Sequence, residues 1–139
     1  MRMNQSQIHA PILADLNALV ADIIMHIQEN APDVAKAYPP GYFVQIVKHS
    51  TLIARDGFGL RDVQAIRLFV TLRWEIGAGY FQHPVIHAAL MEQSLPPMAR
   101  FERLLTAEND HVWLDAARYD GADYWRGDKS WGFDAAGAA

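Results

Sequence analysis

The sequence contains no cysteine, and Lys and Arg together number only 12 among 139 residues. Without cysteine the chain has no disulfide, no thiolate metal ligand and no thiol nucleophile. The basic residues are scattered singly and the formal net charge is −4 at pH 7, so no positive stripe exists to neutralise phosphates. We therefore expect no nucleic-acid partner, and the cytoplasm as the location.

A long uninterrupted apolar run is also absent. Residues 1–7 carry one arginine and then mainly polar side chains, and the apolar segment that follows is interrupted by Asp15, Asn17 and Asp22. A membrane-spanning helix needs about 20 predominantly apolar residues, and a secretory signal needs an apolar stretch behind its positive start. We expect neither a membrane span nor a secretory signal.

What is present is the composition of a globular protein. Hydrophobic residues make up 51% of the chain and charged residues 20%, which is too apolar for a disordered protein. A chain of 139 residues buries roughly two-thirds of the surface that it exposes when unfolded. One domain around one hydrophobic core is expected.

Apolar side chains recur at positions i, i+3 and i+4, the pattern of helices that bury one face. Proline and glycine separate these segments, and residues 31–41 hold at most one turn. The pattern predicts an all-α fold, a single compact domain of five or six helices. Four of the predicted helices span residues 8–29, 42–55, 62–77 and 84–90. A fifth begins at Pro97, with Leu105 pointing inward, and a last one is capped by Asn109 or Asp110.

The helix at residues 62–77 is expected to be central, because its apolar residues cover most of its circumference. It contains Arg73, Trp74 and Glu75, which place two charged side chains beside an indole. We expect the charged side chains to form an ion pair at the edge of the domain or to extend their aliphatic stems into solvent. The preceding segment 57–59 lacks the lysine and later glycine of a nucleotide-binding loop. We interpret it as a helix-terminating turn.

Histidine supplies the first candidates for chemistry. His83 and His87 are spaced i, i+4, but Pro84 makes His83 the expected cap of the next helix, with His87 on the surface. A catalytic zinc needs a third protein ligand, and neither Met91 nor Glu92 completes a known pattern. We therefore predict no metal site.

Serine catalysis is not indicated either. The adjacent His49 and Ser50 point about 100 degrees apart on a helix and do not face each other. No nucleophile-elbow glycines surround a serine, and the acidic residues lie on solvated faces. The sequence predicts no catalytic residue, no cofactor and no enzymatic activity.

The chain changes character after the helical domain, which we place at residues 1–119. Residues 120–139 interleave glycine, aromatic and charged residues, and are predicted to form an irregular tail packed on the domain or on a partner. Tyrosine and tryptophan are enriched in binding hot spots. The predicted contacts with a partner protein are Tyr124, Trp125, Trp131 and Phe133.

The order of residues 59–105 resembles small helical proteins encoded in bacterial type VI secretion clusters. The shared pattern is a helix ending in glycine, an aromatic residue, a His-Pro step, a short helix, a proline-containing turn and an Arg-Leu helix. It falls on Gly77, Phe81, Pro84, Leu90, Pro97, Arg103 and Leu104. Each of these residues has a structural role, so the resemblance assigns no functional residue.

The resemblance implies an accessory protein, an adaptor or co-chaperone that holds a secreted effector or its loading chaperone. One alternative is an immunity protein, since an acidic chain suits the basic cleft of a toxin. An alternative of another class is a metal-binding enzyme or sensor that uses His83 and His87. A small-ligand binder with a pocket between helices also stays open.

Overall fold

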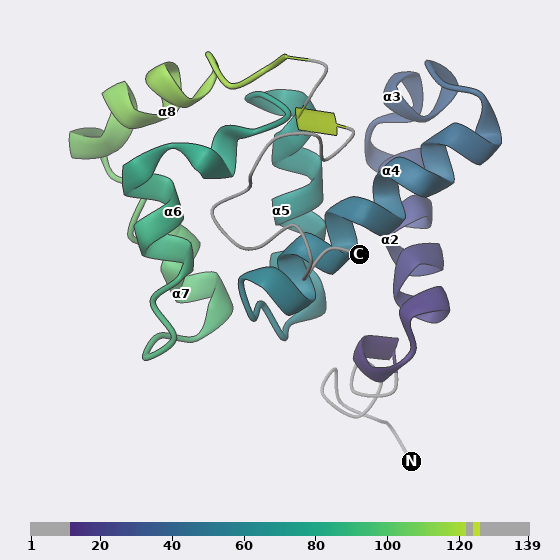
Figure 1. The fold of residues 1–139 in the computed structure, drawn as a ribbon, viewed down its shortest axis with the longest axis horizontal. Coiled ribbons are helices and arrows are strands. Elements are labelled where there is room, and N and C mark those ends of the chain that lie inside the picture. Colours follow the sequence, from purple (N-terminus) through teal and green to yellow (C-terminus); the bar gives the residue numbers. More distant parts are fainter. Residues whose placement is uncertain (1–11, 122–123, 126–139) are drawn as a thin grey trace.

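The computed structural model describes residues 12–121 and 124–125 (Figure 1). Within them the chain forms one all-helical compact domain, so the predicted fold class is confirmed. The longer helices are α2 (Leu16–Asn30), α4 (Pro40–Leu52), α5 (Val63–Glu75), α6 (Pro84–Leu90) and α8 (Asp110–Ala116). The shorter elements are α3 (Pro32–Lys36), α7 (Pro97–Glu102), the π-helical η1 (Ile53–Gly57) and the 3₁₀ turns η2 (Tyr80–Gln82) and η3 (Ala107–Asn109). Among these described helices, none is long and apolar enough to cross a membrane.

The first predicted helix is divided in two. Residues 12–14 form one helical turn, Asp15 adopts an extended conformation, and α2 begins at Leu16. The Asp15 carboxylate accepts a hydrogen bond from the backbone N–H of Ala18, which is the role of an N-cap. The prediction of a continuous helix over residues 8–29 was therefore wrong at Asp15, because the capping side chain starts a new helix there. Residues 8–11 of the predicted helix lie outside the described part of the chain.

Helix α4 continues directly into the π-helical turn η1. The backbone N–H of Phe58 donates to the carbonyl of Ile53, which is five residues earlier. Gly59 then reverses the chain with a φ of 68°, a conformation that favours glycine. The predicted helix over residues 42–55 and the predicted turn at 57–59 are both confirmed.

Helix α5 is the centre of the domain, with α2 and α4 on one side and α6 and α7 on the other (Figure 1). Asp62 caps it by accepting from the N–H of Ala65. Phe69 on α5 contacts the rings of Phe58 and Phe81 at centroid distances of 5.5 and 5.1 Å. The core therefore forms around α5, as its apolar circumference predicted.

Helix α8 packs against η2 and η3. Val112 and Ala116 of α8 are buried, and the indole N–H of Trp113 donates to the carbonyl of Leu104. Leu104 is buried, whereas Leu105 is 66% exposed. The prediction that Leu105 points inward was wrong, because α7 ends at Glu102 and the chain turns away from the helical path there.

Candidate functional site

Arg73, near the end of α5, is fully buried. Its side chain is 1% exposed, although a guanidinium is seldom buried without partners. Nε donates to the carbonyl of Ala78 at 2.7 Å, and one terminal nitrogen donates to the Ser50 hydroxyl at 2.6 Å. The other terminal nitrogen donates to the carbonyl of Tyr124 at 2.7 Å. Arg73 thus joins α5 to α4 and to the start of the C-terminal tail.

Two aromatic rings cover the guanidinium of Arg73. Its central carbon lies 4.5 Å from the ring centroid of Trp125 and 5.5 Å from that of Phe81. Burial lowers the pKa of Arg73 to about 9, so the group still carries its charge at neutral pH. The prediction of an edge ion pair or solvated stem was wrong for Arg73, because two of its acceptors, on Ser50 and Tyr124, come from segments distant in sequence.

Two glycines make room for the tail beside Arg73. The backbone N–H of Gly79 donates to the carbonyl of Tyr119 at 2.6 Å. A Cβ at Gly79 would overlap the ring of Tyr124, and a Cβ at Gly77 would lie 3.2 Å from the Tyr119 carbonyl oxygen. The absence of side chains at both positions therefore permits Tyr119 and Tyr124 to lie against the domain.

Trp125 completes a chain of aromatic rings at the ends of α3, α4 and α5. Trp74 lies 4.9 Å from Trp125 and 6.5 Å from Tyr38, measured between ring centroids. Tyr38 in turn contacts Tyr42 at 5.8 Å, and its hydroxyl accepts a hydrogen bond from the Trp74 indole. Tyr42 is 47% exposed and the other three are partly buried. We call these four residues the aromatic surface.

The four predicted partner contacts are only partly described. Tyr124 and Trp125 lie against the domain, where Tyr124 covers Gly79 and Trp125 is part of the aromatic surface. Trp131 and Phe133 lie outside the described residues. The role of all four in partner binding stays a prediction. Tyr38, Tyr42 and Trp74 were missed, because their sequence positions do not show that three helix ends meet.

The histidine pair is held in a structural arrangement. His83 caps α6, with Nδ1 accepting from the N–H of Val85. Nε2 therefore carries the ring proton, and it donates to the carboxylate of Asp115 at 3.0 Å. His87 packs edge-on against Phe58 at 5.2 Å and is partly buried, not on the surface as predicted. In the described part of the chain, no group of three His, Asp or Glu side chains is placed to hold a metal.

Ser50 is buried and its hydroxyl is engaged on both sides. It donates to the carbonyl of Ile46 at 2.7 Å and accepts from Arg73. Burial, and then the positive charge of Arg73, lower the pKa of the neighbouring His49. The arrangement stabilises the junction of α4 and α5 and leaves the Ser50 hydroxyl no proton to give to a base.

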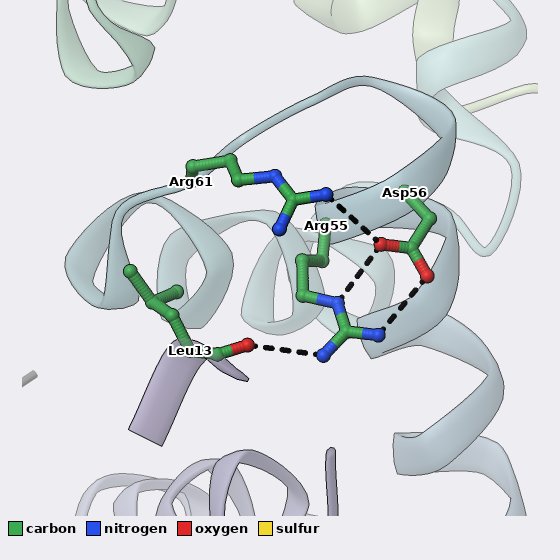
Figure 2. Close-up of polar contacts among 4 residues, drawn as sticks. All are labelled: Leu13, Arg55, Asp56 and Arg61. Carbon is green, nitrogen blue, oxygen red and sulfur yellow. Dashed lines mark hydrogen bonds and ion pairs between the residues drawn. The ribbon is translucent and has the colours of Figure 1, made fainter. Parts of the chain in front are cut away.

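A second polar cluster joins η1 to the N-terminal turn (Figure 2). Arg55 forms a two-pronged contact with the carboxylate of Asp56, at 2.9 and 3.1 Å, and donates to the carbonyl of Leu13 at 3.0 Å. Arg61 approaches the same carboxylate at 3.7 Å. The hydrogen bond from Arg55 to Asp56 raises the pKa of Arg55. Because Arg55 satisfies a carbonyl at the end of the turn at 12–14, we interpret the cluster as structural.

An open groove of about 570 Å³ lies between α6 and the segment from the end of α7 to η3. The apolar residues that line it are Pro84, Val85, Ala88, Ala89 and Leu104. The polar residues that line it are Glu92, Arg103 and Asn109. We call it the α6–α7 groove. Sequence reasoning missed it, although the consecutive residues Ala88 and Ala89 of α6 are a signal of a helix face with little side-chain volume.

Arg100 is a second buried arginine that sequence reasoning missed. It is 3% exposed and donates to the carbonyls of Leu95, Phe58 and Leu90 at 2.9, 2.9 and 3.1 Å. These bonds tie α7 to the end of α6 and to the turn after η1. Arg100 therefore supports one side of the α6–α7 groove.

Comparison with protein-family models, with curated proteins and with solved structures found no match for this chain. The resemblance of residues 59–105 to type VI secretion accessory proteins stays a prediction.

Proposed function

We propose that this protein is a non-enzymatic adaptor that binds another protein through the aromatic surface. The observation that carries the proposal is the contact of Trp125 with Trp74 at the end of a row of partly exposed rings that reaches Tyr42. Aromatic side chains in such a row offer large contact area with little rotamer entropy to lose on binding. Arg73 holds the Trp125 end of the row, through its contact with the Trp125 ring and its hydrogen bond to the carbonyl of Tyr124.

The resemblance of residues 59–105 to type VI secretion accessory proteins suggests what kind of protein the partner is. Proteins of type VI secretion clusters work beside effectors and their loading chaperones, so we propose such a protein in the bacterial cytoplasm as the partner. An immunity role is the second candidate, and the observation that favours it is the net charge of −4, which suits a basic toxin cleft. The metal-site alternative has less support, because both ring nitrogens of His83 already have partners.

The test is light scattering coupled to size exclusion, on the protein alone and after co-expression with the products of its neighbouring genes. We expect a stoichiometric complex that Tyr42→Ala weakens about tenfold or more. Leu114→Ala is the matched control, because Leu114 is 77% exposed on α8, away from the aromatic surface. Trp131→Ala and Phe133→Ala test the remaining predicted contacts.

A complex that Tyr42→Ala does not weaken would contradict the aromatic surface as the binding site. Absence of any complex would contradict the adaptor itself. The immunity candidate requires in addition that the protein protect cells that express the neighbouring toxin, and an adaptor need not do so.

A further inference from the structure

We draw no further inference here: the strongest candidate, the uncharged surface patch at the start of α4 where Val44 is 40% exposed, is an apolar helix face, and nothing in the part of the chain that the structure describes shows what covers it.

Discussion

The guanidinium of Arg73 lies 4.5 Å from the ring centroid of Trp125, 52 positions later in the chain. It also donates to the carbonyl of the residue before Trp125. One buried cation therefore supports both the end of α5 and the first part of the C-terminal tail. The aromatic surface depends on this contact, because the Trp125 ring that Arg73 contacts also lies 4.9 Å from the ring of Trp74.

Loss of this cation should destabilise the whole domain. We expect Arg73→Met to lower the free energy of unfolding by about 2–4 kcal/mol, because three acceptors lose a charged donor, while removal of a buried charge offsets part of the loss. Arg73→Lys should also lower the free energy of unfolding, since an ammonium group does not have the planar, forked set of donors of a guanidinium. Urea unfolding followed by circular dichroism measures both variants.

The control for Arg73 is Arg118→Met, whose side chain is 83% exposed and pairs with Asp115 at the surface. It should change the free energy of unfolding by less than about 0.5 kcal/mol. An Arg73→Met protein as stable as the Arg118→Met protein would show that the buried contacts contribute little.

The contact of the tail with Gly79 gives the second prediction. Gly79→Ala should displace Tyr124, because the added Cβ overlaps its ring, and should destabilise the domain by about 1–3 kcal/mol. Tryptophan fluorescence should change as well, since Trp125 follows Tyr124 and its ring lies 4.9 Å from that of Trp74.

Gly41→Ala is the matched control for Gly79→Ala. Gly41 lies in α4 and nothing lies within 4 Å of an added Cβ, so the substitution should stabilise the helix by up to about 1 kcal/mol. If both glycine variants behave alike, the tail does not lie on Gly79 in solution.

His49 gives a prediction about pH. Burial, and then Arg73, lower its pKa below the ordinary value of 6.5, so the unfolded chain binds the proton more readily than the folded one. The stability that neutral His49 contributes is complete above the unfolded pKa and is lost as the pH falls through the folded pKa. The free energy of unfolding should therefore fall between about pH 7 and about pH 5.

His49→Gln should reduce this dependence on pH, whatever its effect at neutral pH. Denaturant unfolding at a series of pH values measures the slope, and His111→Gln serves as the control because His111 is exposed. Identical slopes for the His49 variant and the original protein would contradict the assignment. His26, whose pKa burial also lowers, acts in the same direction in both proteins and cancels in the comparison.

His83 and Arg73 show how much of the site could be predicted from the sequence. Pro84 after His83 was sufficient to predict the cap of α6, because capping depends on residues within one turn. The partners of Arg73 were not predictable in that way, since Ser50 and Tyr124 approach it from other segments. Periodicity placed Arg73 in a helix with apolar residues all round and did not show what faced it.

By itself, the sequence determined that this chain is helical, where most helices begin and end, and that the core forms around residues 62–77. Those features depend on local spacing, proline and capping side chains, and these act over a few residues. Only the tertiary structure decided that Arg73 and Arg100 are buried, that four aromatic residues from separate elements meet, and that α6 leaves a groove beside Leu104. These features depend on which segments pack together, because hydrogen-bond acceptors and neighbouring rings come from distant parts of the chain.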